Sequence, residues 1–75
     1  MTDNETRMLA FEKQWFRRIG EKETAIRETF DWSPVRYYTR LNRLLDDPQA
    51  LAAEPVLVNR LRRIRDSRLS ARAVR

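Results

Sequence analysis

The sequence predicts a small all-α domain, built from four main helices and a short connector helix around a central helix-turn-helix. Apolar residues recur every three or four positions in four separate segments, which is the spacing of one face of a helix. No segment alternates apolar and polar residues over the length of a strand, and no hairpin turn motif occurs. We therefore expect no β-sheet and no wing beside the helix-turn-helix.

The first helix is expected to run from Thr2 to about Ile19. Thr2 and Glu5 have the three-residue spacing of a capping box, in which each side chain bonds the backbone N–H of the other. Gly20 is the only glycine and is expected to end the helix in a left-handed conformation. The apolar stripe of this helix consists of Met8, Leu9, Phe11, Trp15, Phe16 and Ile19.

The helix-turn-helix is predicted from residue 21 to residue 46. Its first helix covers 21–30, and Asp31 takes the left-handed position in the turn, which Asp tolerates better than most residues. Ser33 is a preferred N-cap, and Pro34 stands at the first helical position, where a missing N–H costs nothing. The second helix then runs from Pro34 to about Asp46.

This second helix has two different faces when it is drawn at about 100° per residue. Tyr37 lies at the centre of an apolar face that also holds Leu41, Leu44 and Leu45. No acidic residue occurs between Ser33 and Leu45, so the opposite face is cationic. Guanidinium, amide and hydroxyl groups of this kind contact phosphates and base edges. That polar face comprises Val35, Arg36, Thr39, Asn42 and Arg43, with Arg40 on its flank.

The rest of the chain is predicted to form the connector and a last helix. Asp47 can cap a short helix that begins at Pro48, and Pro55 marks a second break. The last helix is expected to begin at Val56 and to pack through Leu57, Leu61 and Ile64, with Val58 beside them, to about Arg65. Residues 1–66 would form the domain, and 67–75 a basic C-terminal extension. The expected core is Met8, Phe11, Trp15, Ile19, Ile26, Phe30, Tyr37, Leu41, Leu45, Leu57 and Leu61.

Composition limits the function. The 75 residues contain no Cys and no His, so thiolate sites, imidazole catalysis and His–metal ligation are excluded. We expect no enzyme, cofactor or metal site. The net charge of +5 arises entirely after residue 53, since residues 54–75 hold seven Arg and two acids while the earlier part balances nine against nine. Such asymmetry favours an anionic partner. The polar start and the absence of a long apolar run predict a cytoplasmic protein without a membrane segment.

Four segments of the chain resemble a known family of small actinobacterial proteins. They are FEKQWFR at 11–17, GEKETAIRETF at 20–30, SPVRYYTRLNRLLDDPQAL at 33–51 and PVLVNRLRRIR at 55–65. That family is catalogued as a domain of unknown function and grouped with helix-turn-helix domains. The resemblance implies a helical fold of the DNA-binding type and supplies no activity. The connector also resembles region four of sigma factors, which is an analogy of fold alone.

These observations lead to two functional hypotheses. The first is a transcriptional regulator or nucleoid-associated protein that binds double-stranded DNA, with the helix from Pro34 in the major groove and Arg36 as the main base reader. The second is a module that docks on RNA polymerase or a sigma factor. A homodimer is compatible with either. The DNA-contacting residues of the first hypothesis are Ser33, Val35, Arg36, Thr39, Arg40, Arg43, Arg60, Arg62, Arg63, Arg65, Arg68 and Arg72.

Overall fold

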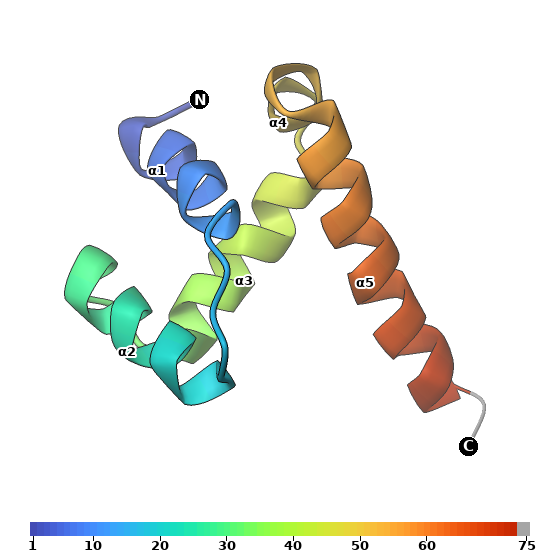
Figure 1. The fold of residues 1–75 in the computed structure, drawn as a ribbon. Coiled ribbons are helices and arrows are strands. Elements are labelled where there is room, and N and C mark those ends of the chain that lie inside the picture. The colour runs from blue at the N-terminus through green and yellow to red at the C-terminus, as the bar shows by residue number, and fades with distance from the viewer. Residues whose placement is uncertain (74–75) are drawn as a thin grey trace.

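The computed structural model describes residues 1–73 and contains five helices, as expected (Figure 1). No strand occurs in this part of the chain, and none of its helices is long and apolar enough to cross a membrane. Helix α3 runs through the middle, with α1 and α2 on one side and α5 on the other. The helices are α1 (Asp3–Glu12), α2 (Ile19–Phe30), α3 (Pro34–Leu45), α4 (Pro48–Ala53) and α5 (Pro55–Ala73).

Helix α1 begins as predicted and ends seven residues earlier than predicted. Thr2 and Glu5 form the capping box, with N–H···O distances of 2.8 and 3.2 Å. The helix then stops at Glu12, and residues 13–18 form a loop. The expected continuation to Ile19 was wrong, because a helix would have carried Phe16 about 140° around the axis from Phe11. The loop instead brings the two rings to 5.4 Å.

Because α1 ends early, three residues do not have the positions that were expected for them. Trp15 is 83% exposed and Ile19 is 67% exposed, so both predictions of core positions were wrong. Gly20 does not end α1, because it is the second residue of α2 and has no left-handed backbone conformation. The apolar periodicity of the sequence predicted a longer helix, but packing of Phe16 on Phe11 favours a loop at residues 13–18.

The helix-turn-helix geometry agrees with the prediction. Asp31 adopts the left-handed conformation, with φ of 58°. The Ser33 hydroxyl accepts a hydrogen bond from the Arg36 N–H at 3.2 Å, and Pro34 occupies the first turn of α3. Trp32 in the turn stacks on Phe30 with ring centroids 5.1 Å apart. The turn is therefore tied both to the helix before it and to the helix after it.

Helices α4 and α5 follow the two proline signals. The Asp47 carboxylate caps α4 by accepting from the Gln49 N–H at 2.9 Å. Helix α5 begins at Pro55 and continues unbroken through Ala73, so it includes most of the expected extension. The Cα radius of gyration is 12.7 Å, whereas a compact domain of this length has about 11 Å. Helix α5 contributes to this elongation, because it is long and diverges from α3 toward its C-terminal end (Figure 1).

The core lies between α1, α2 and α3 and is closed by α4 and the start of α5. Most predicted members are confirmed, but Leu61 is only half-buried, and Ala50 and Val58 are fully buried although neither was expected there. The buried apolar residues are Met8, Leu9, Phe11, Ile26, Phe30, Tyr37, Leu41, Leu44, Leu45, Ala50, Leu57 and Val58.

One buried carboxylate joins three helices. Glu12, at the end of α1, is 7% exposed and accepts hydrogen bonds from the Tyr37 hydroxyl of α3 at 2.5 Å and the Lys22 ammonium of α2 at 3.1 Å. Burial, and secondarily the nearby Glu12 charge, raises the pKa of Tyr37 far above its usual value. Tyr37 therefore remains a neutral donor, and a buried charge of this kind is retained only with such partners.

Candidate nucleic-acid interface

Helix α3 turns its polar side outward. Tyr37, Leu41, Leu44 and Leu45 are buried, which fixes the rotation of the helix about its axis. The residues opposite them form the outer face of α3, which we define as Val35, Arg36, Thr39 and Arg43; all four are exposed, Val35 by 78%. Two guanidinium groups, a hydroxyl and an apolar side chain thus point into solvent from a helix that the core holds in place.

The N-terminal turn of α3 provides additional polar groups. The Ser33 hydroxyl accepts from the Arg36 N–H, and the Thr39 hydroxyl donates to the Val35 carbonyl at 2.9 Å. A hydroxyl carries one donor and two acceptor sites. Ser33 can therefore still donate to an anion while it caps the helix, and Thr39 can still accept from a donor on a base.

Arg40 lies on the flank of α3 and is held by an aromatic side chain. Its guanidinium carbon is 4.5 Å from the centroid of the Trp32 ring, within the range of a cation–π contact. Trp32 in turn stacks on Phe30 of α2. Arg40 therefore joins α3 to the turn and, being exposed, keeps its charge beside the outer face.

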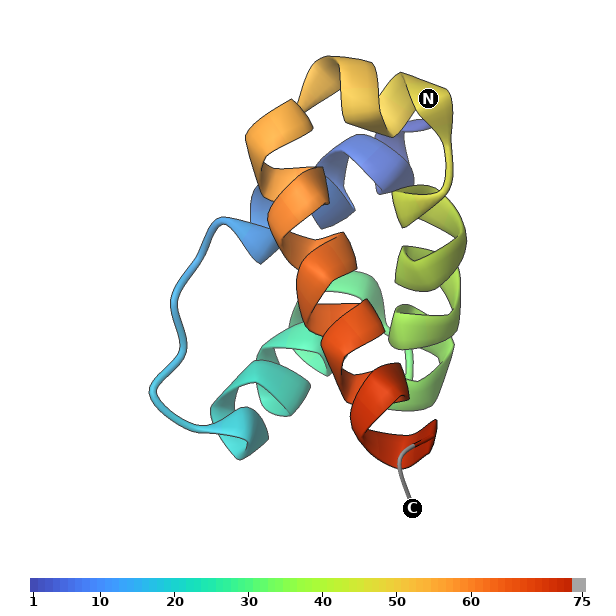
Figure 2. The same cartoon turned by 90° about the vertical axis from the view of Figure 1, so that its right-hand side faces the viewer.

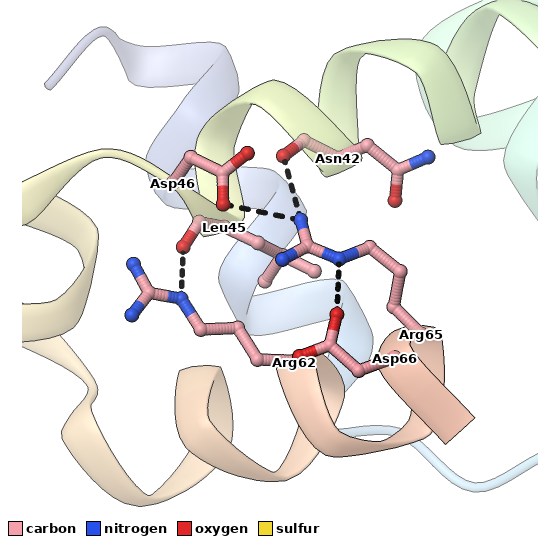
Figure 3. Close-up of polar contacts among 6 residues, drawn as sticks. All are labelled: Asn42, Leu45, Asp46, Arg62, Arg65 and Asp66. Carbon is pink, nitrogen blue, oxygen red and sulfur yellow. Dashed lines mark hydrogen bonds and ion pairs between the residues drawn. The ribbon is translucent and has the colours of Figure 1, made fainter. Parts of the chain in front are cut away.

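Two of the predicted phosphate-binding arginines have partners within the protein. Arg62 is half-buried, and its Nε donates to the Leu45 carbonyl at 2.6 Å (Figure 3). Arg65 Nη1 reaches the Asn42 carbonyl at 3.5 Å and the Asp46 carboxylate at 3.2 Å. The last carbonyls of a helix have no partner within it, and cations are favoured there. Arg62 and Arg65 therefore cap the C-terminal end of α3 and attach α5 to it.

The other arginines of α5 lie on a different side of that helix. Arg60, Arg63 and Arg68 are exposed, and they line a shallow pocket of about 440 Å³ together with Ile64 and Ser67. At about 100° per residue, Arg60 and Arg63 lie on the side of α5 away from Arg62 and Arg65. The Arg72 side chain lies outside the described residues. The structure thus separates the predicted cationic set into the outer face of α3, the junction between α3 and α5, and the solvent side of α5.

Arg62 and Arg65, at the junction between α3 and α5, were predicted to bind phosphates because the core-facing side of α5 was predicted slightly wrongly. Leu57, Leu61 and Ile64 were expected to face the core, but Ile64 is 42% exposed and Val58 is fully buried. The true stripe is rotated toward Val58 and continues through the stems of Arg62 and Arg65. The positions 58, 62 and 65 do have helical spacing, and arginine stems can lie along apolar surface. That spacing was the sequence signal from which the inward position of Arg62 and Arg65 could have been predicted.

The structure shows the fold, and one comparison shows the family. It is a small all-α protein with a capped helix-turn-helix and two exposed cationic surfaces, and residues 1–73 contain no cluster of acidic side chains that could hold a metal ion. The chain belongs to the family described as "Protein of unknown function (DUF3263)", which matches residues 1–73. Searches of curated proteins and of solved structures found no match.

Proposed function

We propose that the protein binds double-stranded DNA with α3 in the major groove. The observation that carries the proposal is the outer face of α3. This face belongs to the second helix of a helix-turn-helix, it is exposed, and α3 contains no acidic residue. The N-terminal part of that helix is where helix-turn-helix proteins reach base edges.

Each group on this face has a distinct role in the proposal. Arg36, near the N-terminus of α3, reads guanine through its paired N–H donors, which is the commonest specific contact. Thr39 and Arg43 contact the neighbouring bases or phosphates, and the methyl groups of Val35 suit a thymine methyl. Ser33 and Arg40, at the edges of the face, contact the backbone, which sets register rather than sequence.

The arginines of α5 contribute in two ways. Arg62 and Arg65 position α3 through its terminal carbonyls, so their contribution to DNA binding is indirect. Arg60, Arg63, Arg68 and Arg72 supply positive charge that attracts phosphates and makes affinity dependent on salt. A transcriptional regulator or a nucleoid-associated protein, located in the nucleoid, would have these properties.

The proposal is tested by comparing Arg36→Ala with Arg63→Ala. Anisotropy titrations would use a duplex selected from a random library and a scrambled duplex, at several salt concentrations. Arg36→Ala should cost about 1–3 kcal/mol on the selected duplex and relax preference at one position, whereas Arg63→Ala should weaken both duplexes alike and lower the salt slope by about one. Arg27→Ala on α2 removes an exposed arginine that is not among the proposed DNA contacts, and it is the matched control.

Two results would contradict the proposal at different levels. Equal weakening of both duplexes by Arg36→Ala would remove the base-reading role and leave nonspecific binding. Absence of binding by the wild-type protein at low salt would refute DNA binding altogether. The second function considered from the sequence, docking on RNA polymerase or a sigma factor, stays a prediction. A separate surface between α2, α3 and α5 supports docking on a protein without identifying that partner.

A further inference from the structure

A groove of about 370 Å³ lies where α2 begins, α3 passes and α5 leaves the body. Its floor includes Leu41 and Leu45 of α3, and its apolar edges are Ile19 of α2 and Leu61 and Ile64 of α5. In Figure 2, α5 crosses in front of α2 and α3, and the 13–18 loop stands off to one side. The groove is therefore bordered by three helices, and Arg62 and Arg65 attach the α5 side of it to α3.

The edges of this groove expose large apolar side chains. Ile19 is 67% exposed and Ile64 is 42% exposed, while Leu61 is half-buried. All three border one groove, so they form a patch rather than scattered surface residues. A contiguous apolar patch with a polar rim is typical of a surface that binds another protein.

Three cationic side chains line the groove, beside the Glu12 carboxylate. Lys22 and Arg65 lie at the rim, but they are paired with Glu12 and with Asp46 and Asp66. Arg68 lines the groove and also lines the adjoining pocket with Arg60, Arg63 and Ile64. Arg60, Arg63 and Arg68 form no ion pair with any side chain of residues 1–68. The apolar patch thus continues into a surface with uncompensated positive charge.

The arrangement of charged and apolar side chains favours one kind of ligand for this groove over two others. A symmetric dimer through this groove would place the cationic surface of one copy near the cationic surface of the other, which like-charge repulsion opposes. A DNA backbone would satisfy the arginines but would leave Ile19, Leu61 and Ile64 without apolar contact. A helix with an apolar stripe and flanking carboxylates satisfies both requirements.

We propose that this groove binds an acidic amphipathic helix of a partner protein. The apolar stripe of that helix lies on Ile19, Leu61 and Ile64, and its carboxylates bind Arg68 at the groove and Arg60 in the adjoining pocket. The site shares arginines of α5 with the proposed phosphate contacts but does not include the outer face of α3, so it stands whether or not that face binds DNA.

A selection from a displayed library of random 16-residue peptides tests the chemistry of the occupant directly. The target is the full chain, and each enriched peptide is then synthesised and titrated by fluorescence anisotropy. Enriched peptides should carry acidic residues together with apolar residues three or four positions apart. Ile64→Glu should weaken their binding at least tenfold, and Arg68→Glu should do the same at low salt.

Val56→Glu is the matched control for Ile64→Glu. Both changes place a carboxylate on an exposed apolar position of α5, but Val56 is 81% exposed and does not line the groove. Val56→Glu should change peptide affinity less than twofold. Circular dichroism and urea midpoints of all variants establish that each is folded, so a loss of binding by Ile64→Glu reports the groove.

Several outcomes would overturn the proposal. They are a failure to enrich any peptide, enrichment of peptides without acidic residues, and equal binding by Ile64→Glu and Val56→Glu. A wild-type dimer in sedimentation equilibrium that Ile64→Glu dissociates would assign the groove to a second copy. A larger loss of DNA affinity in Ile64→Glu than in Val56→Glu would assign it to the DNA surface. Failure of DNA binding alone leaves the peptide result unaffected, so the two proposals are tested separately.

Discussion

Replacing Arg62 by Met should destabilise the fold, although this residue lies in an arginine-rich segment that resembles a nucleic-acid contact. Met retains much of the aliphatic stem and removes the guanidinium. The lost interaction is the 2.6 Å hydrogen bond from Arg62 Nε to the Leu45 carbonyl (Figure 3). That carbonyl belongs to the last residue of α3 and has no partner within the helix.

The size of the effect follows from the environment of this bond. A hydrogen bond from a charged donor contributes about 1.5–3 kcal/mol, and an acceptor left without a partner carries a desolvation cost. The site is half-buried, so water can partly replace the guanidinium. We therefore expect the free energy of unfolding to fall by about 1–2 kcal/mol, which corresponds to a decrease in Tm of about 4–16 °C for a domain of this size.

Urea denaturation followed by circular dichroism measures the difference, with Arg63→Met as the matched control. Arg63 is the next residue along α5 and is exposed, and its replacement changes the net charge by the same amount. We expect Arg63→Met to stay within about 0.5 kcal/mol of wild type. Coincident urea midpoints for the two variants would show that Arg62 does not support the junction, and the capping argument would fail.

Three further changes test the fold. Trp15→Ala should change the free energy of unfolding by no more than about 0.5 kcal/mol, because the ring is 83% exposed. Thermal unfolding of the variant and the wild type measures the difference, and a loss of several kcal/mol would show that Trp15 belongs to the core. Gly20→Ala should stabilise by about 0.4–1 kcal/mol in urea, since a Cβ there meets nothing within 4 Å and the residue is helical; a lower midpoint would contradict this. Tyr37 keeps its proton in the folded state while the unfolded chain releases it near pH 10, so wild-type stability should fall above pH 10 by up to about 1.4 kcal/mol per pH unit more than that of Tyr37→Phe. Parallel slopes for the two proteins would show that burial does not hold that proton.

The starts of α1, α3 and α4 and the turn could be predicted because their signals are local, whereas α2 starts at Ile19 rather than at the predicted Glu21 and has no side-chain cap. Thr2, Ser33 and Asp47 each bond a backbone N–H two or three residues further on, so the neighbouring sequence determines the cap. Asp31 likewise takes the left-handed position within a turn of three residues. Such features depend little on the rest of the molecule.

The end of α1 could not be predicted because contacts with other parts of the fold determine it. Residues 13–18 contain no Gly or Pro, so nothing in the local sequence stops the helix at Glu12. The helix stops where the Glu12 carboxylate meets Tyr37 of α3 and Lys22 of α2, and where Phe16 returns to Phe11. Each of these contacts requires the other helices to be in place.

The candidate site was predictable on α3 and less so on α5. Leucines and a tyrosine mark the buried side of α3 clearly, and they left Arg36 and Arg43 exposed as expected. On α5, charge alone did not reveal which arginines have partners. Arg62 and Arg65 lie against carbonyls that become visible only when α5 is placed beside the end of α3.

The position of Arg65 has a thermodynamic consequence. This side chain bonds the end of α3 through the Asn42 carbonyl and Asp46, and it also lines the groove between α2, α3 and α5. A ligand in the groove that draws Arg65 away would loosen the C-terminal end of α3. In our proposal α3 is the helix that binds DNA. By linkage, DNA would then change the affinity of the groove for its ligand by the same factor. Where both proposals hold, one guanidinium group would couple the two binding events.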